Sequence, residues 1–174
     1  MSTTEHTGTR TVDAGERADL LESLARGRHF LRFTAQNLTD EQAGHRSTTS
    51  ELSVGGLIKH VTQMESRWAR FIAGGAAAMG RADPEDFANG FRMQPDETLK
   101  GLLEDYAEVA ARTDELISTL DLDSSWPLPE APWFKPNTSW TVRRVALHVI
   151  AETAQHAGHA DIIRETLDGQ KSMG

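Results

Sequence analysis

Apolar residues recur every three to four positions along four long stretches of the chain, with polar residues between them. This spacing matches the turn of an amphipathic helix, about 3.6 residues, and we find no alternation typical of a strand. The stretches run from about Ala14 to Leu38, from Ser53 to the pair Gly74 and Gly75, from Asp96 to Leu120, and from Ser139 to Gly169. The pattern predicts an all-α four-helix bundle.

Several ends of these stretches carry residues that commonly begin or end a helix. Asp13 with Glu16 resembles a capping box ahead of the first helix, and Thr39 with Gln42 predicts a short helical turn after it. Gly169 follows the fourth stretch, where a glycine often ends a helix. These signals place the helix boundaries within a few residues.

Two connections, after the second and third helices, are longer than tight turns. Residues 75–95 are rich in glycine and predict a loop or lid, with a short helix around Glu85. Residues 121–138 contain four prolines and three aromatic residues, Trp126, Trp133 and Phe134. We expect these aromatic side chains to pack over an open end of the bundle, and the alternative is that they line a pocket.

Length and composition narrow the class of protein. We expect residues 1–174 to form a single domain, with flexible ends at 1–12 and 170–174. The formal net charge of −8 argues against nucleic acid or an anionic membrane as a partner. No apolar run could span a bilayer and no signal peptide is evident, so we expect a cytoplasmic protein. The oligomeric state is left open, with a homodimer as one option.

The fourth helix carries an unusual group of ionisable side chains. Three histidines and a glutamate follow at spacings of four, four and three residues: His148, Glu152, His156 and His159. At about 3.6 residues per turn they fall within an arc of about 80° on one helix face. Val145, Val149 and Ile163 lie on the same face, which therefore points toward a core. Because buried ionisable groups need a neutralising partner, this face predicts a metal site.

The chain contains no cysteine, so a metal would be bound by histidine, aspartate or glutamate. Glu152 and His156 can reach one ion from adjacent turns, and His60, on the apolar side of the second helix, can supply a third ligand. This set suits Zn²⁺ with one position open for water or substrate, and it also suits Fe²⁺ or Ni²⁺. From spacing alone, His148 with Glu152 and His156 with His159 are viable pairs as well. The metalloprotease motif His-Glu-x-x-His is absent.

Four segments carry a resemblance to a known family, in the same order along the chain. They are Gly15 to Leu21, Leu38 to Gln42, Leu52 to His60 followed by Glu65 and Trp68, and Leu147 to Gly169. These segments resemble the DinB-like superfamily of four-helix bundles. The resemblance is strongest to the actinobacterial branch of mycothiol-dependent enzymes, of the maleylpyruvate isomerase and mycothiol S-transferase type.

The resemblance implies a particular set of ligands. His60, Glu152 and His156 match the His/Glu/His metal site of the maleylpyruvate isomerase type. His159 falls where many relatives carry glutamine, so it and His148 are expected to line the pocket or contact the ligands. The chain departs from close relatives at Ala151, where an acidic residue is common, but this position lies off the metal-binding face.

The resemblance also implies a thiol-dependent activity. A thiol bound to Zn²⁺ is deprotonated at neutral pH, and the thiolate is the nucleophile. Because the chain has no cysteine, the thiol would be a cosubstrate such as mycothiol, used for S-transfer to an electrophile or for thiol-assisted isomerisation. One alternative is a metal-dependent hydrolase that activates water. Another is a non-catalytic bundle that binds a ligand or a structural metal, which a fourth ligand at His159 would favour.

Overall fold

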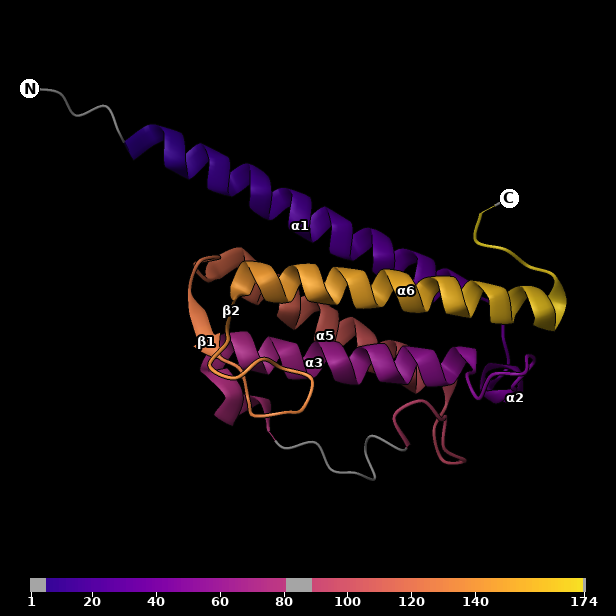
Figure 1. Ribbon diagram of the computed structural model, residues 1–174. Helices are drawn as coiled ribbons and strands as arrows, with labels where there is room; N and C mark the ends of the chain where they lie inside the picture. The colour runs from indigo at the N-terminus through magenta and orange to yellow at the C-terminus, as the bar shows by residue number, and fades with distance from the viewer. Residues whose placement is uncertain (1–5, 81–88, 174) are drawn as a thin grey trace, which may run out of the picture.

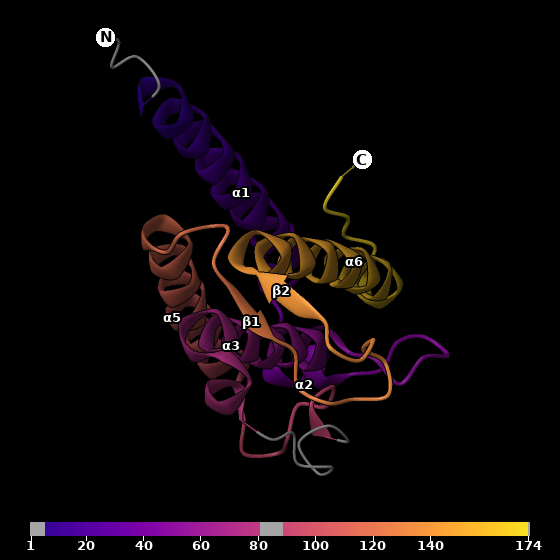
Figure 2. The same cartoon turned by 60° about the vertical axis from the view of Figure 1, so that its left-hand side comes forward.

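The computed structural model describes residues 6–80 and 89–173, and only the backbone of residues 6–13. Its elements are α1 His6–Thr34, α2 Asp40–Gly44, α3 Val54–Met79, α5 Leu99–Thr119, β1 Ser125–Pro127, β2 Ser139–Thr141 and α6 Val142–Asp168. Helix α1 packs mainly on α6, and α3 packs on both α5 and α6 (Figures 1 and 2). The predicted all-α bundle is confirmed, and its long connections follow α3 and α5.

The predicted start of α2 and the predicted end of α6 are formed by the residues that signalled them. The hydroxyl of Thr39 accepts a hydrogen bond from the backbone N–H of Gln42, whose side chain accepts one from the backbone N–H of Thr39. Gly169 ends α6 with a φ of 80°, in the left-handed region that favours glycine. Local capping chemistry therefore sets these boundaries.

Helix α3 changes direction at the glycine pair where the sequence predicted its end. Gly74 and Gly75 have non-helical backbone angles, and the helix then continues for a short distance to Met79. Gly75 has a φ of 74°, and a β-carbon at this position would lie only 2.8 Å from the ring of Trp126. The indole N–H of Trp126 donates to the carbonyl oxygen of Ile72. A glycine is therefore needed here both for the backbone angle and for the close approach of the indole.

Three predicted helix starts were wrong, and that of α6 is described with the hairpin below. Helix α1 already begins at His6, so Asp13 and Glu16 lie within the helix and form no cap at its start. Helix α5 begins at Leu99 instead of Asp96, because the hydroxyl of Thr98 caps its first turn. Helix α1 thus begins before the predicted start near Ala14, and α5 begins after the predicted start at Asp96.

The ends of the chain were predicted to be flexible, and part of this prediction lies outside the described residues, as does the short helix around Glu85. Residues 6–12 are helical. At the other end, the backbone N–H of Ser172 donates to the carboxylate of Asp161, so residues that follow α6 contact its last turns.

A short antiparallel hairpin corrects the expectation that the chain has no strands. Strands β1 and β2 pair in the register that places Trp126 opposite Trp140. Each strand has three residues, which is too short for an alternating pattern to be recognised. Because Ser139–Thr141 is a strand, α6 begins at Val142, with Thr141 as its cap.

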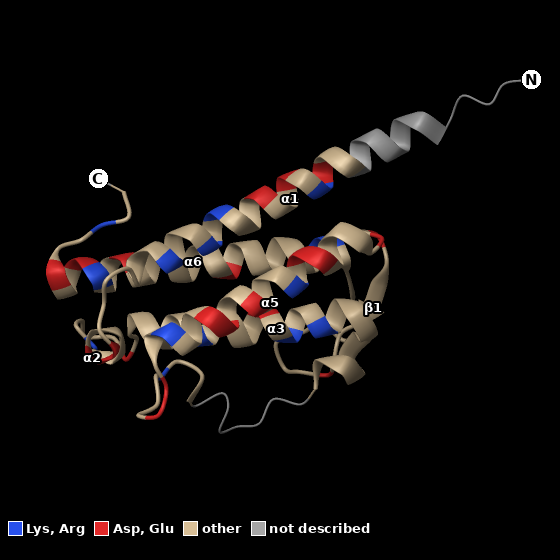
Figure 3. Cartoon of the chain, turned by 180° about the vertical axis from the view of Figure 1, so that it is seen from behind, with Lys and Arg blue, Asp and Glu red and all other residues tan. Residues whose placement is uncertain are grey.

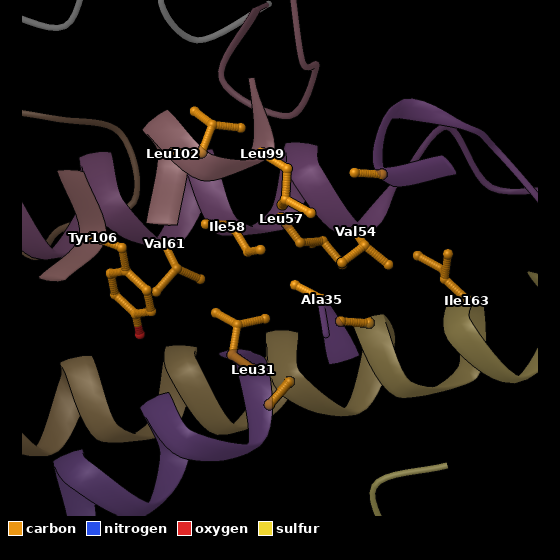
Figure 4. Packing of buried hydrophobic residues seen from close by; sticks show 13 residues of the cluster. Leu31, Ala35, Val54, Leu57, Ile58, Val61, Leu99, Leu102, Tyr106 and Ile163 are labelled. Atoms are coloured by element: carbon orange, nitrogen blue, oxygen red, sulfur yellow. The ribbon is translucent and has the colours of Figure 1, made fainter. Parts of the chain in front are cut away.

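Two clusters of buried apolar side chains fill the bundle. One joins the end of α1, the first half of α3, the start of α5 and the second half of α6, and it includes Leu31, Leu57 and Ile163 (Figure 4). The other joins the remaining halves of α1, α3 and α6 with the end of α5, and it includes Trp68 and Val145. Charged residues of both signs are distributed along the helices (Figure 3).

Candidate metal centre

Three of the predicted site residues converge where α3 packs against α6. His60 lies in the first half of α3, and Glu152 and His156 lie on adjacent turns of α6. Each can offer one ligand atom such that all three atoms lie within 4.8 Å of one another. Ligand atoms around a tetrahedral Zn²⁺ lie about 3.3 Å apart, given metal–ligand bonds of about 2.0–2.2 Å. The arrangement fits a small divalent ion that would draw these side chains slightly closer.

The carboxylate of Glu152 lies between two histidines of its own helix. One oxygen, Oε2, is 3.7 Å from Nε2 of His156, and the other, Oε1, is 4.0 Å from Nδ1 of His148. Both distances are longer than hydrogen bonds, so neither oxygen is committed to a histidine. The exposed fraction of the side chain is 32% for Glu152 and 10% for His156. The site is therefore more open to solvent on the Glu152 side.

Burial controls the charge of the two proposed histidine ligands, His60 and His156. Burial, with a smaller contribution from the neighbouring His156, lowers the pKa of His60 to about 4. Burial also lowers the pKa of His156, against the opposing effect of the Glu152 carboxylate. Both imidazoles are neutral at neutral pH, which is the form that binds a metal ion. The donor set is thus two neutral imidazoles and one carboxylate, which fits a divalent metal.

The other two histidines of the motif lie beside this group and are not part of it. Nδ1 of His159 is 3.4 Å from Nδ1 of His156, on the side of the His156 ring opposite the nitrogen that faces Glu152. A contact at this position can orient a metal-binding ring. The expectation that His159 and His148 contact the ligands or line the pocket is compatible with these positions and stays a prediction.

An aromatic cluster continues from His148 toward the hairpin. Trp68 of α3 and Trp140 of β2 stack nearly parallel, with ring centroids 4.7 Å apart, and His148 contacts the edges of both. Phe134 packs edge-on against the two indoles, and the guanidinium of Arg144 lies 4.2 Å from the Trp140 centroid. Phe134 packs against the second apolar cluster, as expected, but the expectation is wrong for Trp133, which is 76% exposed. Through His148 the aromatic cluster also lies beside the site.

One neighbour of the site was missed by sequence reasoning. Phe91, in the connection between α3 and α5, stacks on His60 with ring centroids 3.7 Å apart and ring planes 17° apart. Its ring centroid is also 5.9 Å from that of His156. Phe91 is a single aromatic residue in an irregular segment, so no spacing or motif in the sequence could signal this contact.

Comparison with known families identifies the group to which this bundle belongs. The family described as Mycothiol-S-transferase matches residues 19–169, from α1 to the glycine that ends α6. The chain belongs to the mycothiol S-transferase family. Membership confirms the resemblance to the DinB-like, mycothiol-dependent branch and indicates a thiol-related transferase with a small-molecule thiol partner.

A solved structure shares the fold. It is described as the conserved protein of a locus from Enterococcus faecalis, and the match covers 88% of this chain and 97% of that chain with a TM-score of 0.65. At 15% sequence identity, this likeness supports the bundle fold alone. No curated protein matches the chain. In the described part of the chain, none of the helices has the length and apolar character needed to cross a membrane.

Proposed function

We propose that the protein transfers a thiol of the mycothiol type to an electrophile, or uses it to assist an isomerisation, with a divalent metal bound by His60, Glu152 and His156. The observation that carries this proposal is the convergence of two neutral imidazoles and one carboxylate within 4.8 Å. Family membership supports the thiol chemistry, and the donor set supports the metal.

The side chains of the protein supply binding, orientation and charge. His60 and His156 would act as neutral ligands and Glu152 as an anionic one, which leaves a position open for a small molecule. A bound divalent ion lowers the pKa of a thiol that coordinates it, so that the thiol is held as a thiolate. Because the chain has no cysteine, this sulfur belongs to a cosubstrate.

The surroundings of the three ligands bias how the cosubstrate approaches. Glu152 is the more exposed of the two ligands on α6, so the thiol approaches from its side. His148 and Trp140 form an aromatic wall there, which favours a planar or aromatic part of the electrophile. In the transfer, the thiol releases its proton, the sulfur forms a bond to an electrophilic carbon, and the leaving group departs with the bonding electrons.

The proposal extends to the metal, the partners and the location. Zn²⁺ is our first choice because it accepts nitrogen and oxygen ligands with one position open, and Fe²⁺ and Ni²⁺ accept the same set. The partners are a small thiol and an electrophile, and the net charge of −8 disfavours nucleic acid. We place the reaction in the cytoplasm, where small thiols are kept reduced.

A conjugation assay tests this proposal. The Zn²⁺-loaded protein is incubated with monochlorobimane and with mycothiol, glutathione or no thiol, and the fluorescent conjugate is measured. We expect a rate above the uncatalysed reaction with mycothiol, and its loss after chelation or in His156→Ala. His29→Ala is the matched control, because His29 is exposed on α1 and its ring contacts are Phe30 and Phe33.

Two other results would replace the proposal. Consumption of an ester or amide without any thiol, at a rate that depends on the same three ligands, would assign a metal-dependent hydrolase. A protein that binds metal or small molecules without turnover of either kind would be a binding or structural bundle.

A further inference from the structure

The stacking of Phe91 on His60 places an aromatic ring directly against a proposed metal ligand. The two rings are nearly parallel, with centroids 3.7 Å apart and planes 17° apart. The lone pairs of imidazole nitrogens lie in the ring plane. A neighbour that fixes this plane therefore fixes the direction in which His60 can bind an ion.

The backbone around Phe91 is fixed to α3 independently of the ring. A β-carbon on Gly56 would overlap the carbonyl oxygen of Phe91, so the absence of a side chain at Gly56 lets this segment pack directly on the helix. One turn further along α3, the ammonium of Lys59 donates to the carbonyl of Arg92 and forms an ion pair with Glu97 at 2.7 Å. These contacts hold the segment on the same helix that carries His60.

Among the described residues, no other contact than that of Phe91 would orient the ring of His60. Metal-binding histidines usually donate their second N–H to a carboxylate, carbonyl or water, and this hydrogen bond sets the ring orientation. Within the described residues, His60 makes no hydrogen bond, and its ring contacts are Phe91 and His156. His156, in contrast, has His159 next to its second nitrogen.

We propose that Phe91 is a positioning residue for His60, which holds the imidazole plane and covers one of its faces. This inference rests on the proposed metal site. The ring of Phe91 keeps His60 aimed at the position shared with Glu152 and His156, and it shields that side of the site from water. Exchange of ligands is thereby directed to the more exposed Glu152 side.

The test measures how fast Zn²⁺ leaves the full-length protein for a chromogenic chelator. Loss of an orienting neighbour of a metal ligand typically weakens metal binding by about 10–100-fold. We expect faster release of this size in Phe91→Ala, a rate close to the wild type in Phe91→Tyr, and a value between them in Phe91→Leu. Thermal unfolding of the metal-free variants is measured in parallel, because release and fold stability must be separated.

Phe30→Ala is the matched control. Phe30 is also partly buried against the same apolar cluster, and its ring contacts are His29 and Arg26. Its truncation should lower stability without changing metal release. Equal release rates in Phe91→Ala and Phe30→Ala would overturn the positioning role.

A second pair of variants tests whether the segment around Phe91 must pack directly on α3, while the Phe91 side chain is kept. Gly56→Ala should displace the Phe91 backbone and accelerate metal release. Gly158→Ala should not, because among the described residues an added β-carbon there would have no neighbour within 4 Å beyond the backbone of its own helix. If Gly56→Ala keeps the expected fold and releases Zn²⁺ at an unchanged rate, direct packing of the Phe91 segment on α3 does not hold His60 in place.

The outcomes separate this inference from the proposed function. A wild-type protein that binds no Zn²⁺ would refute both the proposed function and the positioning role of Phe91. Normal metal binding with no effect of Phe91→Ala removes only the role of Phe91. Accelerated release in Phe91→Ala, together with absence of thiol transfer, removes only the thiol chemistry.

Discussion

Arg28 and Glu65 form an ion pair that is almost completely buried between α1 and α3. Nη2 of the guanidinium lies 2.5 Å from Oε1 of the carboxylate, and the exposed fractions of the side chains are 3% and 0%. Nη1 of the same guanidinium lies 2.7 Å from Oδ1 of Asp114, which is 43% exposed. Leu24 and Leu31, on either side of Arg28 in α1, belong to different apolar clusters. The pair therefore lies in a polar layer between the two halves of the core.

Removing the buried carboxylate should strongly destabilise the bundle. Glu65→Ala leaves the buried Arg28 guanidinium without its main partner, which typically lowers the free energy of unfolding by about 3–5 kcal/mol. Urea denaturation checks this value. Asp114→Ala is the control, and because Asp114 is partly exposed its cost should stay below about 1 kcal/mol. Equal losses in the two variants would contradict the importance of burial.

The purified protein should contain about one divalent ion per chain if the three proposed ligands act together. Elemental analysis of His60→Ala, Glu152→Ala and His156→Ala should show that each loses most of the ion, because two ligands of a three-ligand set bind weakly. His29→Ala should keep it. Full metal retention in all three single variants would refute the ligand set.

Removing the metal should leave the fold largely intact. Two apolar clusters fill the bundle along its length, so the helices are held together by side-chain packing on both sides of the site. Chelation should abolish thiol transfer while most of the helical circular dichroism signal persists. If chelation also destroyed the helical signal, the metal would have a structural role.

A thiol that binds at the open metal position should be visible in Co²⁺-substituted protein. Thiolate coordination to Co²⁺ produces a charge-transfer band in the near ultraviolet. The chain has no cysteine, so any such band must come from the added thiol. We expect the band with mycothiol, at a pH below that at which the free thiol ionises. Glu152→Ala should lose it. Absence of the band with every thiol, together with consumption of a substrate without thiol, would argue for activation of water instead.

Acid should weaken the link between the ends of α1 and α6. Arg164 donates to the carbonyls of Thr34 and Gln36 and to the carboxylate of Asp168. Hydrogen bonds from Arg164 and from the backbone N–H of Gln170 hold the pKa of Asp168 below its usual value of 3.8. Because the folded-state pKa is lowered, the stabilisation is present above pH 3.8 and is lost as the pH falls through the folded-state pKa.

Asp168→Asn should therefore be less stable than the wild type near pH 6, with a difference that shrinks below pH 3.8. Urea midpoints measured for both proteins between neutral and acid pH check this expectation. A difference that grows toward acid pH would contradict the sign of the linkage.

Much of the site's local geometry follows from the sequence. In a regular helix, residue spacing determines which side chains share a face, so the grouping of Glu152 and His156 on α6 could be predicted. Capping is equally local, which is why the ends at Thr39 and Gly169 were predicted. The placement of His60 on the apolar side of its helix made it a candidate, but spacing could not say whether it meets His148, Glu152 or His156.

The approach of His60 to Glu152 and His156 was decided by the tertiary structure, as were the stacking of Phe91 and the pairing of Arg28 with Glu65. The hairpin belongs to the same class, because strands of three residues form only when another strand is brought beside them. Periodicity and capping depend on neighbours within one or two turns. Contacts between helices depend on the register in which their side chains interlock, which is a property of the packed core as a whole.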